Sequence, residues 1–174
     1  ILHFKDQFQI ENVEIKIVKT KGDEIQNKKF SEIGEKELFS KKIKDALLKK
    51  KIDIAVHALK DMPTRETKGL KTICYLKRND KREVFISRKK KTFNELPKGS
   101  VIGTSSFRRE FQLKQIRNDL KYKLIRGNID TRIKKLDKKL YDGIILAYAG
   151  IKLLDFKKKV SQIFSTSKII PSAG

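Results

Sequence analysis

The chain has 174 residues, of which 38% are hydrophobic and 37% charged, enough apolar residues for one good core or two small ones. Its only cysteine, Cys74, excludes an intramolecular disulfide and a CxxC metal site, and two distant histidines are too few for a metal cluster. The net charge of +22 would suit a nucleic-acid partner, but the lysines are spread along the chain without a basic, aromatic-lined stripe, so we expect none. No apolar run is long enough for a signal peptide or a membrane span, which predicts a cytoplasmic protein without membrane contact.

The first half of the chain predicts alternating strands and helices. We expect the end of a helix at 1–10, strands at 13–19, 52–59 and 70–77, and a helix over 35–50. The run IDIAVHAL at 52–59 is β-branched and bounded by charge, which is typical of a buried parallel strand. Cys74 falls in the strand at 70–77 and is expected to be a buried thiol.

The second half repeats this alternation after a charged stretch at 77–83, which we interpret as a crossing between two domains. We expect strands at 84–87, 100–103, 122–125 and 143–147, a short turn of helix at 92–96, and helices that begin near 104, 129 and 148. The helix near 129 has Asn128 as its N-cap and Ile133 and Leu136 on its inner face. The whole pattern favours a layered α/β fold.

The stretch GTSSFRR, residues 103–109, joins a predicted strand to a predicted helix. Thr104, Ser105 and Ser106 fall in the first turn, where open backbone N–H groups and the helix dipole favour an anion. Arg108 and Arg109 add planar donors that suit a carboxylate or phosphate. A serine N-cap followed by two solvated arginines is the alternative.

A second junction, Arg126-Gly127-Asn128, follows the same logic. The arginine closes a strand, the glycine permits a tight turn, and Arg132 comes one helical turn after Asn128. Each arginine alone fits an ordinary surface position paired with Asp or Glu. Together, the two junctions at one sheet edge predict a cleft for a ligand with several carboxylates.

Lys60 and Asp61 stand at the carboxyl end of the strand predicted at 52–59, immediately before Met62 and Pro63. Ligands of open α/β sheets bind beyond the carboxyl ends of strands. A carboxylate with a lysine neighbour can stay ionised there and act as a charge stabiliser or proton acceptor. A solvated surface turn is the alternative.

Five motifs carry a resemblance to a known family. They are VHALKDMPT (56–64), GTSSFRR (103–109), RGNIDTRIKKLD (126–137), YDGIILAYAGIKLL (141–154) and IIPSAG (169–174). In this order and spacing the chain resembles the hydroxymethylbilane synthases, also called porphobilinogen deaminases. The resemblance implies two α/β lobes similar to type II periplasmic binding proteins, namely 1–76 and 82–170, with a hinge at 77–81 and 171–174 returning to the first lobe. The N-terminal strand of the first lobe and a third α+β domain would lie outside this chain.

The resemblance also implies a transferase of tetrapyrrole (porphyrin and heme) biosynthesis. Such an enzyme joins four porphobilinogen units head to tail, with loss of ammonia, on a covalently held dipyrromethane cofactor, and water releases hydroxymethylbilane. Asp61 matches the catalytic aspartate, and Lys36 resembles a lysine of a mobile loop over the cleft. The positions that match binders of the acetate and propionate arms are Lys60, Thr104, Ser105, Ser106, Arg108, Arg109, Arg126, Gly127 and Arg132. A monomer without a metal is expected.

Two departures from the family and two competing functions accompany this interpretation. Ala58 stands where many relatives have Ser, and Leu153 where relatives often have Arg. The cysteine that anchors the primer would follow Gly174, so we expect these 174 residues alone to be inactive. The alternatives are a non-catalytic two-lobe anion-binding module and a nucleic-acid binder whose affinity collapses with salt.

Overall fold

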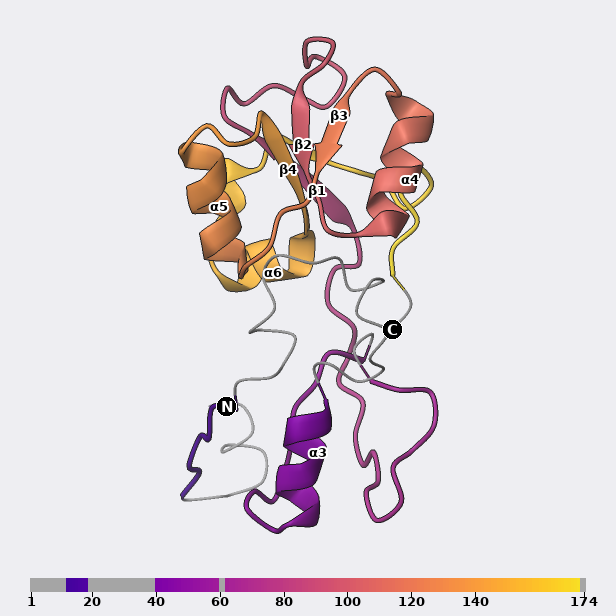
Figure 1. Ribbon diagram of the computed structural model, residues 1–174, viewed down its shortest axis with the longest axis vertical. Helices are drawn as coiled ribbons and strands as arrows, with labels where there is room; N and C mark the ends of the chain where they lie inside the picture. Colours follow the sequence, from indigo (N-terminus) through magenta and orange to yellow (C-terminus); the bar gives the residue numbers. More distant parts are fainter. Residues whose placement is uncertain (1–11, 19–39, 60–61, 173–174) are drawn as a thin grey trace.

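The structure is a computed structural model that describes residues 12–18, 40–59 and 62–172. Its elements are α3 (Lys41–Leu48), β1 (Glu83–Ser87), β2 (Val101–Gly103), α4 (Phe107–Ile116), β3 (Lys121–Lys123), α5 (Ile129–Asp137), β4 (Gly143–Ala147), α6 (Tyr148–Leu153), the 3₁₀ helix η3 (Lys157–Lys159) and β5 (Gln162–Ile163). The sheet and helices α4 to α6 lie at one end of an elongated molecule, and α3 lies at the other (Figure 1). None of the described helices is long and apolar enough to cross a membrane.

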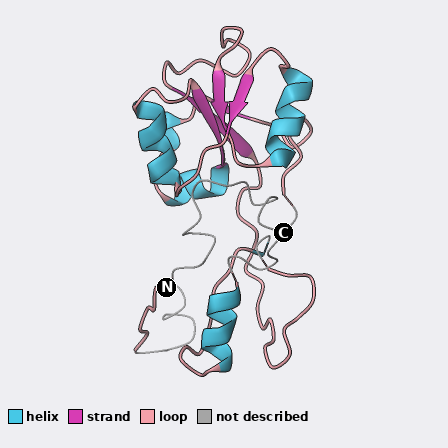
Figure 2. Ribbon diagram, viewed as in Figure 1, coloured by secondary structure: helices cyan, strands magenta, loops and turns pink. Residues whose placement is uncertain are grey.

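One mixed sheet, seen between helices in Figure 2, organises residues 83–163. Its strand order is β3-β2-β4-β1-β5. Strand β2 runs parallel to β3 and β4, whereas β1 runs antiparallel to β4 and β5. The carboxyl ends of β2, β3 and β4 therefore share one edge of the sheet. Because β1 is antiparallel to β4, it begins at that same edge, where Glu83 pairs with Ala147.

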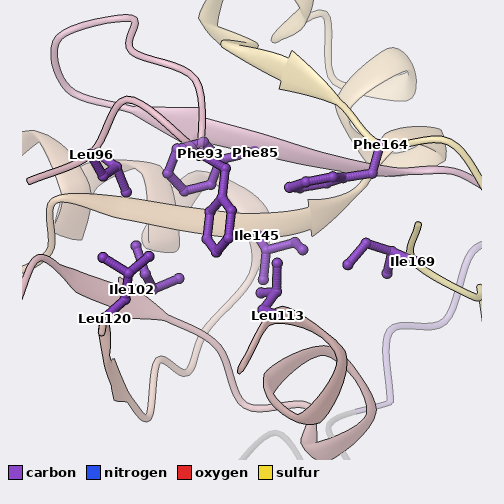
Figure 3. Close-up of a cluster of buried hydrophobic side chains, with 9 residues drawn as sticks. All are labelled: Phe85, Phe93, Leu96, Ile102, Leu113, Leu120, Ile145, Phe164 and Ile169. Carbon is purple, nitrogen blue, oxygen red and sulfur yellow. The ribbon is translucent and has the colours of Figure 1, made fainter. Parts of the chain in front are cut away.

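Strands β1 and β4 are apolar at every central position, so their side chains are apolar on both faces of the sheet. Both faces are accordingly covered. Phe85 and Ile145 pack on the face that α4 covers through Leu113 (Figure 3). Val84 and Ile144 pack on the opposite face, with Ile133 of α5. On the α4 face, the ring of Phe93 meets Phe85 and Phe164 edge to face, at centroid distances of 5.4 and 5.8 Å. The three layers confirm the α/β class for this part of the chain.

The second half of the chain matches its prediction closely. The expected strands at 84–87, 100–103 and 143–147 are β1, β2 and β4, and the expected helices are α4, α5 and α6. The strand expected at 122–125 starts one residue earlier and is shorter, as β3. Asn128 is the N-cap of α5, although its side chain makes no capping hydrogen bond.

The three strands predicted in the first half are wrong for the residues that the structure describes. No strand occurs within 12–18, 52–59 or 70–77, and their apolar side chains are largely exposed, for example Ile17, Val56 and Ile73. An apolar run becomes a strand only when neighbouring strands pair with it, and every described strand belongs to the 83–163 sheet. The helix expected at 35–50 is confirmed as α3; residues 1–11 and 19–39 lie outside the described residues.

Three smaller differences follow from local chemistry. Cys74 is exposed instead of buried, because its segment forms no strand. Residues 92–96 form a single turn instead of a short helix; the Glu95 N–H donates to the Thr92 carbonyl, and the Glu95 carboxylate accepts from the Thr92 N–H and hydroxyl, but no helix continues from it. Strand β5 has only two residues and no periodic signal, and the sequence pattern missed it.

Gly143→Ala is expected to destabilise the fold by about 1–3 kcal/mol or more, the range for overpacked cores. A Cβ atom at Gly143 would lie 2.2 Å from Cζ and 2.3 Å from Cε2 of the buried Phe85 ring. Gly150→Ala is the matched control, because its Cβ would meet only the flexible end of Ile129. Urea unfolding followed by circular dichroism measures both, and equal losses of stability would contradict the prediction.

Asp142→Asn is expected to lower stability at neutral pH by about 1 kcal/mol, the value of one good hydrogen bond. The Asp142 carboxylate accepts from the Val101 N–H at 2.9 Å and pairs with Arg88 at 2.7 Å. These contacts, the Val101 bond first, hold the pKa of Asp142 below its ordinary value of 3.8. A depressed carboxylate pKa stabilises the fold above 3.8 and loses that effect as pH falls further. The difference between the two proteins in urea unfolding should therefore shrink as the pH falls below 3.8, and a constant difference would refute the role of the charge.

Candidate functional site

The edge shared by the carboxyl ends of β2, β3 and β4 gathers the two arginine junctions that the sequence singled out. Strand β2 leads through Thr104, Ser105 and Ser106 into α4, and β3 leads through Arg126 and Gly127 into α5. Because β2 and β3 are parallel neighbours, the two turns lie side by side. The expectation that both junctions share one sheet edge is confirmed.

The hydroxyl residues of the first junction stabilise their own turn. Ser106 is the N-cap of α4, and its Oγ accepts from the Arg109 N–H. Thr104 is buried, its Oγ1 accepts from the Ser106 N–H, and its own N–H donates to the Lys123 carbonyl at 3.0 Å. The three residues thus precede α4 instead of forming its first turn, and two of the hydroxyls are used within the loop.

Both arginines of the first junction pair with Glu83. Arg108 Nη2 lies 2.5 Å from Oε1 and Arg109 Nη2 lies 2.7 Å from Oε2 of that carboxylate, which is 3% exposed. Arg108 also donates to the Ile170 carbonyl, and Arg109 donates to the Ile145 carbonyl at 3.5 Å. Nothing in the sequence singles out Glu83, because its contact with the arginines depends on β1 entering this edge antiparallel to β4.

The second junction places Arg126 and Arg132 on the same edge. Gly127 has φ +105°, and a Cβ there would lie 2.7 Å from the Thr131 side chain, so the turn requires glycine. The Lys135 ammonium donates to the Arg126 carbonyl at 3.0 Å. Arg132 is part-buried and its Nε donates to the Gly127 carbonyl at 2.7 Å. One tight turn therefore carries Arg126 and holds the Arg132 guanidinium.

The positive charges at this edge oppose one another. Burial, followed by the charges of Arg109 and Arg126, lowers the pKa of Arg132 to about 10. Burial alone lowers the pKa of Arg126. Within the described part of the chain, no carboxylate lies within ion-pair distance of Arg132. A bound anion would relieve this repulsion, which is what a site for a carboxylated ligand requires.

An exposed apolar face adjoins the arginines. Phe107 and Phe111 of α4 point to solvent, 56% and 68% exposed, while Leu113 is fully buried. The two rings, together with Arg108, Gln112 and Ile170, line a shallow open hollow. Charged and apolar surfaces thus lie next to each other at the start of α4.

Three of the site residues expected from the sequence, Lys36, Lys60 and Asp61, lie outside the described residues. Their positions relative to the arginines stay predictions. Of the two departures, Ala58 is exposed in the loop before Lys60, and Leu153 is exposed at the end of α6.

Comparisons with known proteins agree with the chemistry of this edge. The family model described as "Porphobilinogen deaminase, dipyromethane cofactor binding domain" matches residues 2–174. Proteins named porphobilinogen deaminase from Lysinibacillus sphaericus and Helicobacter acinonychis are each 47% identical, over 91% and 92% of this chain. One from Rickettsia bellii is 45% identical over the whole chain.

The chain spans 52% to 58% of the length of these relatives. The match nevertheless includes both arginine junctions and the sequence around Asp61, since it covers almost every residue. The motif resemblance, the family model and the relatives all point the same way, and the chain belongs to the porphobilinogen deaminase family.

Proposed function

We propose that this chain forms the substrate- and primer-binding part of a hydroxymethylbilane synthase. Family membership gives the reaction class. The observation that supports it most directly is the gathering of Arg109, Arg126 and Arg132 at a single sheet edge, where burial, and then the charges of the other two arginines, lower the pKa of Arg132. Porphobilinogen carries an acetate and a propionate, so a growing chain of pyrroles brings two carboxylates per unit.

The dipyrromethane cofactor fits the residues at this edge. Arg126 and Arg132 would hold its carboxylates, and Arg109 would contribute the donors that Glu83 does not use. When bound, the cofactor supplies the pyrrole carbon to which the next unit is joined. The arginines of this chain supply charge and orientation, because each guanidinium can hold a carboxylate through two parallel hydrogen bonds.

Asp61 is the proposed catalytic residue. Loss of ammonia from porphobilinogen leaves a cationic, electron-poor pyrrole, and the ring carbon that attacks it must later lose a proton. A carboxylate beside the pyrrole nitrogens stabilises the cation and can receive that proton. Lys60 would bind a substrate carboxylate beside it, and Lys36 would cover the cleft from its loop.

The proposed architecture has two lobes like those of type II periplasmic binding proteins, 1–76 and 82–170, with the cleft between them and a hinge at 77–81. Arg78 donates through Nη2 to the Ser172 carbonyl at 2.7 Å. The segment at 77–81 and the segment around Ser172 thus run side by side below the sheet (Figure 1). Two chain segments that cross together between the lobes are what the proposed hinge requires. We further propose a cytoplasmic monomer that binds neither nucleic acid nor membrane.

Turnover tests the proposal directly. The complete protein incubated with porphobilinogen should release a product that acid and oxidation convert to a red porphyrin, and its intact mass should include a dipyrromethane. Porphobilinogen binding without product would favour a two-lobe anion-binding module instead. Binding of duplex DNA that weakens steeply with salt, without turnover, would favour a nucleic-acid protein.

A further inference from the structure

The carboxylate of Glu83 lies inside the proposed anion site, where it competes for the same donors as a ligand. It begins β1 at the edge where β2 and β4 end, and it is almost fully buried. Its two oxygens are divided between two guanidinium groups, Oε1 with Arg108 and Oε2 with Arg109. A residue that only completed the sheet would need no charge at this position.

We propose that Glu83 is a positioning residue of the anion site: it fixes Arg108 and Arg109 so that their remaining donors meet a ligand carboxylate in the correct geometry. This inference rests on the proposed function only for the identity of the ligand. The geometry itself concerns any multiply carboxylated molecule.

The other contacts of the two arginines show how the position is defined. Arg108 is held between Glu83 and the Ile170 carbonyl, and Gln112 fixes Ile170 in turn through its backbone N–H and carbonyl. Arg109 is held between Glu83 and the Ile145 carbonyl of β4. An arginine side chain has many rotamers, and a misplacement of about 1 Å can cost a large factor in binding or rate.

Two effects of Glu83 on a bound anion have opposite signs. Its charge repels the anion, whereas its hydrogen bond with Arg108 and its ion pair with Arg109 hold the donors in place. Without the negative charge, Arg108 and Arg109 repel each other in a part-buried site and lose the ion pairs that fix their positions. We expect positioning to be the larger effect, so that the variant with more positive charge binds an anion more weakly.

Glu83→Gln is the first test, with the complete protein produced in cells that make no porphobilinogen, so that no primer is loaded. The probe is pyromellitate, a benzene with four carboxylates, titrated by isothermal calorimetry. We expect Glu83→Gln to weaken its binding about tenfold, and Glu83→Asp about threefold because the shorter arm reaches one guanidinium at a time. Asp142→Asn is the matched control: it breaks an arginine–carboxylate pair at the opposite edge of the same sheet and should bind like the wild type.

Unchanged or tighter binding by Glu83→Gln would overturn the inference, because Glu83 would then be only an opposing charge. Loss of affinity in Asp142→Asn as well would assign the effect to general destabilisation and also overturn it. If Glu83→Gln does not fold, Glu83→Asp decides alone, and wild-type affinity in that variant refutes positioning. If the wild type does not bind pyromellitate, the edge is not an anion site and the inference is overturned as well. If the variants bind pyromellitate as expected but the complete protein forms no porphyrin, the proposed function is refuted and the positioning role of Glu83 stands.

Discussion

Asp61→Asn is expected to lower the rate of porphobilinogen consumption by the complete protein by about 10²- to 10⁴-fold, the range for a lost general acid or base. The substitution keeps the size and polarity of the side chain but removes the charge and the proton acceptor. In the proposed site the arginines, and not Asp61, bind the acidic arms, so KM should change much less than kcat. Stopped assays of porphobilinogen disappearance measure both constants.

Asp53→Asn is the control for this experiment. Asp53 lies in the same segment and is exposed, so its carboxylate should be dispensable. Full activity in Asp61→Asn would overturn the catalytic assignment and leave the arginine site without its proposed carboxylate. A large rise in KM with kcat unchanged would make Asp61 a binding residue instead.

How far the sequence predicts the fold depends on where each strand finds its neighbours. In the second half, β1 and β4 are apolar on both faces and pair with each other, so local pattern and tertiary burial agree. In the first half, the β-branched run at 52–59 has the same local signal but no partner among the described strands, and Val56 is 81% exposed. The periodicity of an isolated run cannot supply the partners that make it a strand.

The site residues likewise fall into those that the sequence could predict and those that it could not. Arg108, Arg109, Arg126 and Arg132 could be assigned from strand-to-helix junctions, because glycine, capping residues and arginine follow one another within a few positions. Glu83 could not, since its proximity to Arg108 depends on an antiparallel strand that enters the edge from the opposite direction. Ser106 forms the serine N-cap that the sequence offered as the alternative, but nothing in the sequence indicated that Thr104 bonds its own loop.

Arg132→Met is expected to raise the stability of the ligand-free protein and to lower its affinity for carboxylates. Burial and the neighbouring charges lower the pKa of Arg132 to about 10, well below that of an ordinary arginine, which means that the fold disfavours the charged side chain at every pH below 10. Methionine removes the repulsion from Arg109 and Arg126 but also the hydrogen bond to the Gly127 carbonyl. After that loss and a discount for partial exposure, we expect a gain of about 1 kcal/mol in the free energy of unfolding.

The same substitution should weaken pyromellitate binding about a hundredfold, since truncating one partner of a buried charge pair costs about 2–5 kcal/mol. Lys134→Met is the control, an exposed residue of the same helix that should change neither quantity appreciably. Urea unfolding and calorimetry measure the two effects on one preparation. A gain in stability together with a loss of affinity is the result expected of a site whose charges repel one another until a ligand binds. A variant that lost stability and kept its affinity would show that Arg132 supports the turn at Gly127 and leaves carboxylate binding to the other arginines.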